Sequence, residues 1–177
     1  MPNPGLIHIY YGDGKGKTTA ALGLALRAAG CGKKVVIVQF LKGWKSGEHN
    51  ILSKMTNITL IRGKTAGGKF IFDMNDEEKS TTKAWQEKSL MKALELINKE
   101  QCDVLILDEV IDAQKLGMLD ENMLIDFIKN KPVSLELIIT GHEPDTILLE
   151  QADYITEMIN RKHPYNNGIP ARKGIEY

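Results

Sequence analysis

The segment GDGKGKTT, residues 12–19, combines three glycines, two lysines and two threonines ahead of a helix-forming stretch. Glycines allow positive φ angles and close backbone approach, so successive N–H groups can point at phosphate oxygens, helped by the N-terminus of the following helix. The order resembles the Walker A pattern G-x-x-x-x-G-K-[ST], except that Tyr11 stands at the first glycine position. The chemistry expected of this segment is the binding of nucleotide phosphates.

Two residues of this loop have particular expected roles. Lys17 adds a mobile positive charge, and the Thr18 hydroxyl is placed to ligate Mg²⁺. The competing interpretation is a glycine-rich turn that binds no ligand, which the order of glycines, lysine and hydroxyl disfavours. The residues expected to contact the nucleotide are Gly12, Asp13, Gly14, Lys15, Gly16, Lys17, Thr18 and Thr19.

Two acidic residues, Asp108 and Glu109, end the apolar run VLILDE. Parallel strands present their carboxyl ends to the ligand crevice, so we expect one or both carboxylates to meet the Mg²⁺ held by Thr18. Acidic residues at a strand end are also often simply solvated, which is the alternative. Among the histidines, we interpret His8 and His49 as structural and leave the role of His142 open.

The loop and the acidic pair must be positioned by a sheet, and six short apolar runs predict its strands. Such continuous runs are typical of parallel strands that are buried on both faces. They span residues 6–11, 34–40, 57–61, 103–109, 135–140 and 153–158.

Helical patterns separate these runs. One helix is expected from Lys17 to Gly30, with Gly30 as a left-handed stop. The longest should begin near Asn75, with Glu78 completing a capping box, and run toward Glu100. Trp85 on this helix is expected in the core. The alternation predicts an α/β fold with a P-loop NTPase-like, open, mostly parallel sheet, helices on both faces, and one domain over residues 1–177.

Composition limits the kinds of binding partner and the cellular compartment that we expect. Lys plus Arg and Asp plus Glu are 23 each, so no excess charge indicates nucleic acid or an anionic membrane as partner. No apolar run approaches the ~18 residues of a membrane span, and we expect a cytoplasmic protein. Cys31 and Cys102 lack metal-binding or redox spacing and are expected to be reduced, buried thiols.

Further motifs follow in a specific order. After the loop come LILDE, IITG and ADYITEM, and the chain ends with KHPYNNGIPARKGIEY, which fits K-H-x-x-x-x-G-x-x-A-x-x-G-I-E/D-Y. Over nearly its whole length, the sequence resembles the P-loop ATP:corrinoid adenosyltransferases, the cob(I)alamin adenosyltransferases of cobalamin synthesis and salvage.

The resemblance implies that a cobalt(I) corrinoid attacks the 5′ carbon of ATP and expels the whole triphosphate. The loop would then hold a leaving group, with Lys15, Lys17 and Mg²⁺ stabilising the charge that develops on it. Lys17 is therefore a candidate catalytic residue. No general base is needed, because the nucleophile is the metal of the substrate. The family further implies a homodimer and a flavoprotein or flavin as reductant.

The resemblance also assigns the segment GGKFIFDMN to the corrinoid half of the site. It implies that Phe70 and Phe72 approach the lower face of the corrin and displace the lower axial ligand, which makes the cobalt easier to reduce. Phe72 stands where a tryptophan is often found, so an apolar wedge is kept and the indole N–H is lost. The competing interpretation is a short strand that buries both rings by alternation.

Two other functions remain open on the sequence alone. One is an ATP-hydrolysing or phosphotransferring P-loop enzyme, in which Asp108 or Glu109 positions water or activates a hydroxyl. The other is a nucleotide-responsive binding module without turnover. Product analysis separates these from adenosyl transfer.

Overall fold

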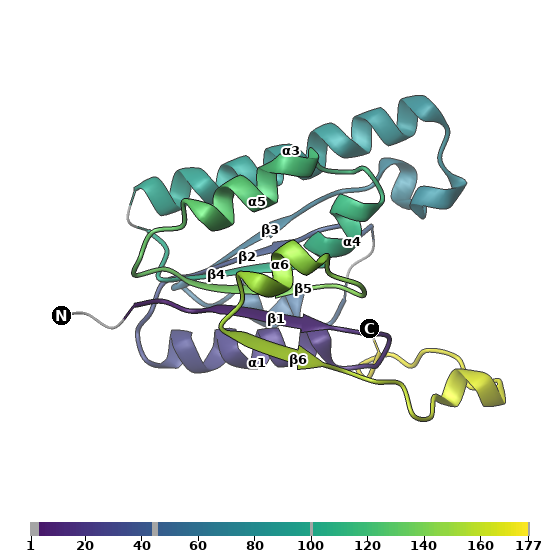
Figure 1. Ribbon diagram of the computed structural model, residues 1–177. Helices are drawn as coiled ribbons and strands as arrows, with labels where there is room; N and C mark the ends of the chain where they lie inside the picture. The colour runs from purple at the N-terminus through teal and green to yellow at the C-terminus, as the bar shows by residue number, and fades with distance from the viewer. Residues whose placement is uncertain (1–3, 44–45, 100, 177) are drawn as a thin grey trace.

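A six-stranded, wholly parallel sheet forms the centre of the protein, as the computed structural model of residues 4–43, 46–99 and 101–176 shows (Figure 1). The strands lie in the order β3-β2-β4-β5-β1-β6. This confirms the predicted fold class and the six predicted strands. The strand bounds are β1 Ile7–Tyr11, β2 Val35–Gln39, β3 Ile58–Arg62, β4 Val104–Asp108, β5 Glu136–Thr140 and β6 Tyr154–Glu157.

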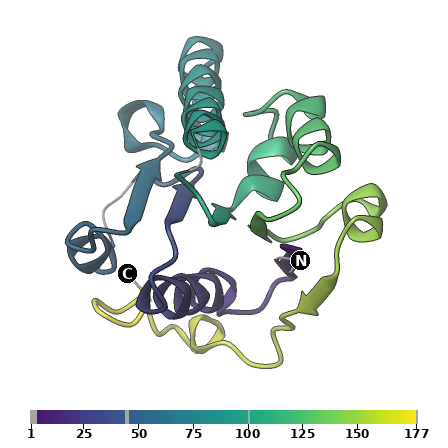
Figure 2. The same ribbon diagram turned by 90° about the vertical axis from the view of Figure 1, so that its left-hand side faces the viewer.

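Helices cover both faces of the sheet (Figure 2). Alternate residues of β2 face opposite layers: Val35 and Ile37 pack with the alanines of α1, whereas Val36 and Val38 join the core under α3. The helix bounds are α1 Lys17–Gly30, α2 His49–Leu52, α3 Asp76–Asn98, α4 Val110–Lys115, α5 Glu121–Lys129 and α6 Thr146–Glu150, with 3₁₀ turns η1 Ala66–Gly68, η2 Ile71–Asp73 and η3 Pro164–Asn167.

The end of α1 differs from the prediction in detail. Gly30 is the last helical residue, and the left-handed position is Gly32, with φ +80°. Cys31 lies between them at the helix end and is exposed, so the expectation that it is buried was wrong. Cys102 is partly buried, and burial raises its pKa to about 12.

The start of α3 confirms the predicted capping box. The Asn75 side chain accepts a hydrogen bond from the Glu78 backbone N–H, 2.9 Å, and the Glu78 carboxylate accepts one from the Asn75 N–H, 3.0 Å. The helix ends at Asn98, and Glu100 lies outside the described residues. The expectation for Trp85 was wrong: it is 39% exposed, because the buried stripe of α3 runs through neighbouring positions such as Gln86 and Leu90.

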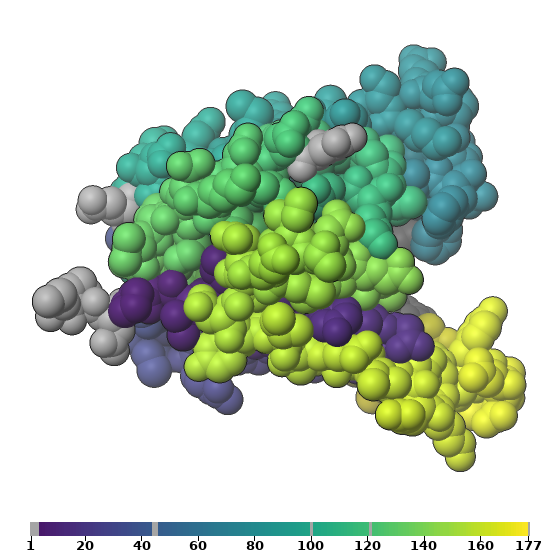
Figure 3. Space-filling model, in the orientation of Figure 1, coloured from purple at the N-terminus to yellow at the C-terminus, as the bar shows by residue number. Residues whose placement is uncertain are grey.

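Three loops meet at the carboxyl edge of the sheet and build the site described below. They follow β1, β4 and β5, and the chain beyond β6 returns alongside them. Figure 3 shows this C-terminal part, in yellow-green and yellow, against the purple N-terminal strand. Among the described residues, no helix is long and apolar enough to cross a membrane.

Replacing Asn75 with alanine should lower the free energy of unfolding by about 1 kcal/mol, because the first turn of α3 loses its cap. Urea denaturation followed by circular dichroism measures the change. Asn122→Ala is the matched control, since Asn122 is an exposed asparagine in the first turn of α5 whose side chain makes no hydrogen bond to the described residues. Equal losses in the two variants would contradict a capping role for Asn75.

Candidate active site

The loop between β1 and α1 is shaped by its glycines and by the chain beyond β6. Gly12 and Gly16 have φ angles of +108° and +116°, which side chains rarely tolerate. A Cβ on Gly12 or Gly14 would lie 2.5 Å from the carbonyl oxygen of Met158. The glycines at 12 and 14 therefore let the Met158 backbone pack directly against the loop.

Two backbone N–H groups of the loop already have protein acceptors in this structure. Gly12 donates to the His142 carbonyl, 2.9 Å, and Gly14 donates to the Met158 carbonyl, 2.6 Å. The N–H groups at the start of α1, from Lys17 to Thr19, have no acceptor within the helix, because the first turn of any helix lacks one. The helix N-terminus is therefore the part of the loop that offers N–H donors to an anion.

The charged side chains of the loop also have partners. Lys17 Nζ donates to the carbonyl oxygens of Gly12, 2.6 Å, and Gly14, 2.8 Å. Burial lowers the pKa of Lys17, and the nearby carboxylates of Asp112 and Glu109 oppose that shift. The ammonium group is thus held directly over the glycine-rich loop.

The C-terminal part of the chain contacts two further loop side chains. Lys15 Nζ forms an ion pair with Glu176, 3.1 Å, and Asp13 Oδ1 accepts a hydrogen bond from the Asn160 N–H, 3.0 Å. In this structure Asp13 holds the chain beyond β6 in place, and Lys15 faces a carboxylate.

Thr18 and Asp108, predicted to share a metal ion, lie in direct contact. The Thr18 hydroxyl donates to Asp108 Oδ1, 2.8 Å, and the same oxygen accepts a hydrogen bond from the Thr140 hydroxyl, 2.8 Å. Asp108 is fully buried. Hydroxyl and carboxylate oxygens suit Mg²⁺, which proteins usually bind through one or two carboxylates together with phosphate oxygens and water.

The described side chains offer only part of the ligand set that the predicted Mg²⁺ would need. Among the described residues, no cluster of three or more histidine, cysteine, aspartate or glutamate side chains is arranged to hold a metal ion. The pair formed by Thr18 and Asp108 therefore fits a cation that arrives with phosphate oxygens rather than one held in a cage of side chains.

Glu109 directly follows Asp108 in the sequence, but its side chain has a different partner from that of Asp108. Its backbone is left-handed, φ +62°, and its carboxylate pairs with Lys42. Burial raises the pKa of Glu109, and the ammonium group of Lys42 opposes that shift. Burial alone would lower the pKa of Lys42, but the carboxylates of Glu109 and Asp108 outweigh it and raise that pKa.

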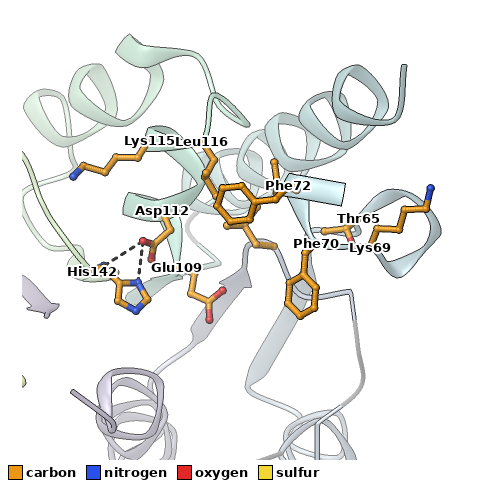
Figure 4. Close-up of a pocket in the computed structure, with 11 residues that line it drawn as sticks. Thr65, Lys69, Phe70, Phe72, Glu109, Asp112, Lys115, Leu116 and His142 are labelled. Carbon is orange, nitrogen blue, oxygen red and sulfur yellow. Dashed lines mark hydrogen bonds and ion pairs between the residues drawn. The ribbon is translucent and has the colours of Figure 1, made fainter. Parts of the chain in front are cut away.

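Glu109 lines a pocket of about 440 Å³ that adjoins the loop (Figure 4). Phe70, just before the 3₁₀ turn η2, and Phe72, on that turn, form part of the pocket wall and are 69% and 83% exposed. The alternative of a short strand that buries both rings was therefore wrong. The lining residues are Leu41, Thr65, Lys69, Phe70, Ile71, Phe72, Glu109, Asp112, Lys115, Leu116 and His142.

His142 connects the pocket with the glycine-rich loop. Its Nδ1 lies 3.0 Å from Asp112 Oδ1 (Figure 4). Its backbone carbonyl accepts a hydrogen bond from the Gly12 N–H. His8 and His49, interpreted above as structural, contact other side chains, and one partner of His49 is Gln39, which also approaches Asp108. His8 lies 2.6 Å from Glu136, and His49 lies 2.7 Å from Gln39.

Several residues of the site were not predicted from the sequence, among them Lys42, Asp112, Thr140 and Met158. Thr140 belongs to the motif IITG, which was noted without a role for its hydroxyl. The contacts of Lys42 and Met158 are made with residues far away in the chain, so no local spacing signals them.

The fold is similar to that of a solved ATPase structure. It superposes on EssC (ATPases 2 and 3) from Geobacillus thermodenitrificans with a TM-score of 0.52 and 13% identity, covering 96% of this chain and 35% of that one. At this identity the similarity supports only the P-loop-like α/β fold.

Sequence comparison gives a closer relationship. Residues 3–177 match the family model described as ATP:corrinoid adenosyltransferase BtuR/CobO/CobP. A corrinoid adenosyltransferase of Escherichia coli (strain K12) is 34% identical over 177 residues, covering 98% of this chain and 86% of that protein. One from Sinorhizobium sp. is also 34% identical, covering 98% of this chain and 80% of that protein. The chain therefore belongs to the ATP:corrinoid adenosyltransferase family of enzymes.

Proposed function

We propose that this enzyme transfers the 5′-deoxyadenosyl group of ATP to the cobalt(I) of a corrinoid such as cob(I)alamin and releases triphosphate. Family membership supports ATP as donor and a corrinoid as acceptor. The observation that carries the proposal is that two regions suited to different ligands, called half-sites here, lie next to each other. A cationic, glycine-rich loop adjoins a pocket with exposed aromatic rings, and His142 contacts both.

The loop is the half-site for the triphosphate in this proposal. Lys17 and the N–H groups at the start of α1 would bind the phosphates, and Lys15 would exchange the carboxylate of Glu176 for a phosphate oxygen. Charge builds up on the leaving triphosphate as the bond to the 5′ carbon breaks. Preorganised cationic and N–H donors stabilise that charge without further rearrangement.

Thr18 and Asp108 are the residues that would hold Mg²⁺, because their oxygen atoms already lie 2.8 Å apart. Mg²⁺ bound there supplies positive charge that neutralises the leaving triphosphate. Glu109 is the second acidic candidate, and it would reach the metal only after leaving Lys42. Asp108 is therefore the primary carboxylate in the proposal.

Phe70 and Phe72 form the corrinoid half-site. Large apolar side chains with this exposure are available for contact with a flat apolar ligand. We propose that they press on the lower face of the corrin and displace its lower axial ligand, so that cobalt(II) is reduced more easily. A flavin or flavoprotein would supply the electron. We further propose that the enzyme is a homodimer that works in the cytoplasm.

Turnover should release one intact triphosphate for each adenosylated corrinoid, because the whole triphosphate is the leaving group. MgATP and a chemically reduced corrinoid are incubated together, triphosphate is quantified by chromatography, and the light-sensitive organocobalt product is followed by its absorption spectrum. Formation of ADP and phosphate in place of triphosphate would favour the hydrolase or phosphotransferase alternative. Binding of ATP without any product would favour the binding module.

Lys17→Ala and Thr18→Ala should each lower kcat/KM about a hundredfold or more, the typical result of losing one preorganised electrostatic contact. The first variant loses phosphate charge. The second should also need a higher Mg²⁺ concentration for half-maximal rate, as should Asp108→Ala. Steady-state rates at several Mg²⁺ concentrations measure both effects.

Lys33→Ala is the control, because Lys33 is an exposed lysine just beyond α1, and this variant should keep the parent rate. A Thr18→Ala enzyme with unchanged Mg²⁺ dependence would remove Thr18 from the metal site.

Phe72→Ala should impair adenosylation that starts from cobalt(II) and a flavin reductant, since a corrinoid that keeps its lower ligand is harder to reduce. The same variant should recover much of its activity with chemically prepared cobalt(I), and its affinity for ATP should stay near that of the parent. Phe72→Trp should be tolerated.

Val133→Ala is the matched control for Phe72→Ala, because Val133 is 78% exposed and lies outside the pocket lining. The deciding measurement is the EPR spectrum of cobalt(II) corrinoid bound with MgATP. Equal amounts of the four-coordinate species in the parent and in Phe72→Ala would show that the ring does not act on the lower ligand.

A further inference from the structure

Thr140, the last residue of β5, makes two hydrogen bonds with one hydroxyl group. Thr140 Oγ1 donates to Asp108 Oδ1, 2.8 Å, and accepts the backbone N–H of Glu109, 2.8 Å. The residue is 1% exposed, so water does not replace either partner easily. The hydroxyl therefore holds both acidic residues at the end of β4.

The first of these bonds fixes a side chain. Asp108 Oδ1 is the oxygen that also accepts the Thr18 hydroxyl, and Gln39 approaches the other oxygen only weakly, 3.4 Å. Without Thr140, the orientation of the carboxylate toward Thr18 would depend on Thr18 itself, on this long contact and on Lys42, whose Nζ lies 3.9 Å from the other carboxylate oxygen. A cation that binds the Thr18 hydroxyl oxygen would then weaken the hydrogen bond from Thr18 to Asp108.

The second bond fixes the backbone. Glu109 is one of two residues other than glycine with positive φ among those the structure describes, and a Cβ makes this left-handed conformation unfavourable. Its N–H needs an acceptor away from water, and Thr140 Oγ1 provides one. This conformation turns the Glu109 side chain into the pocket that Phe70 and Phe72 line (Figure 4).

We propose that Thr140 is a positioning residue shared by the two half-sites: its hydroxyl holds the Asp108 carboxylate against Thr18 for Mg²⁺ and the triphosphate, and holds the Glu109 turn that aims the next carboxylate into the aromatic pocket. The inference rests on the proposed nucleotide and corrinoid half-sites. It gives the motif IITG a role, because a side-chain hydroxyl can donate to a carboxylate and accept from an N–H at the same time.

Two comparisons between variants of Thr140 separate the effect of losing the hydroxyl group from the effect of changing the side-chain volume. Thr140→Val keeps the shape of threonine and loses both hydrogen bonds, whereas Thr140→Ser keeps the hydroxyl and loses a methyl group. Thr140→Ala, compared with Thr140→Ser, repeats the comparison at smaller volume and serves if the valine variant is too unstable to purify.

Thr82→Val is the control for the general loss of a buried hydroxyl. Thr82 is also fully buried, accepts the Ala66 N–H, 3.0 Å, and donates to Met74 Sδ, 3.4 Å, but does not touch the acidic pair. Its replacement should lower the melting temperature without changing how nucleotide binding depends on Mg²⁺.

Isothermal titration calorimetry with inorganic triphosphate, and separately with ATP, over a series of Mg²⁺ concentrations gives a readout that needs no turnover. We expect Thr140→Val and Thr140→Ala to weaken the Mg²⁺-dependent part of binding about tenfold or more, the usual effect of losing a residue that orients a metal ligand. Thr140→Ser should restore it, and Thr82→Val should match the parent.

Parent-like Mg²⁺-dependent binding in both Thr140→Val and Thr140→Ala, with only the melting temperature lowered, would overturn the proposal and leave Thr140 a packing residue. The test is independent of the adenosyl transfer itself. If triphosphate is not the product of turnover, the binding series still decides the role of Thr140, so the two proposals fail separately.

Discussion

The site depends on one hydrogen bond between residues that are 90 positions apart, from the Thr18 hydroxyl to the Asp108 carboxylate. It joins the start of α1 to the end of β4. A carboxylate that is fully buried must be supplied with donors, and those of Asp108 come from α1, from β5 and, at longer range, from β2. The strand order satisfies this need, because β4 lies between β2 and β5.

The elements of the fold could be predicted because each has a local cause. The strands are short apolar runs buried on both faces, and α3 begins where Asn75 and Glu78 can bond to each other. Trp85 and Cys31 were placed wrongly because burial depends on which neighbours cover a side chain. On α3, polar Gln86 is buried and Trp85 beside it is half-exposed, a choice that no hydrophobic pattern of the helix predicts.

Some residues of the candidate site could likewise be predicted from local sequence, and others could not. The loop residues from Gly12 to Thr19 follow each other in the chain, so their spacing indicates their chemistry. Lys42 and Asp112 enter the site through turns and pairings that appear only when the strands are side by side. For Phe70 and Phe72 the sequence allowed two structures, and the exposure of both rings excludes the buried strand. What the rings contact is a property of the complex and not of the chain alone.

The C-terminal part of the chain contributes to the shape of the loop. The Met158 N–H donates to the Tyr11 carbonyl, and the Met158 carbonyl accepts the Gly14 N–H, so the chain beyond β6 continues the pairing of β6 with β1. Farther along, Glu176 faces Lys15, and its hydrogen bonds with Arg172 hold its pKa at about 2, so it is a carboxylate at neutral pH. An anionic oxygen thus already sits on a loop lysine in the protein itself, and a phosphate that binds Lys15 has to replace it. The loop holds Met158 and Asn160 through hydrogen bonds that do not involve Glu176, so the proposed exchange on Lys15 would not require these contacts to break.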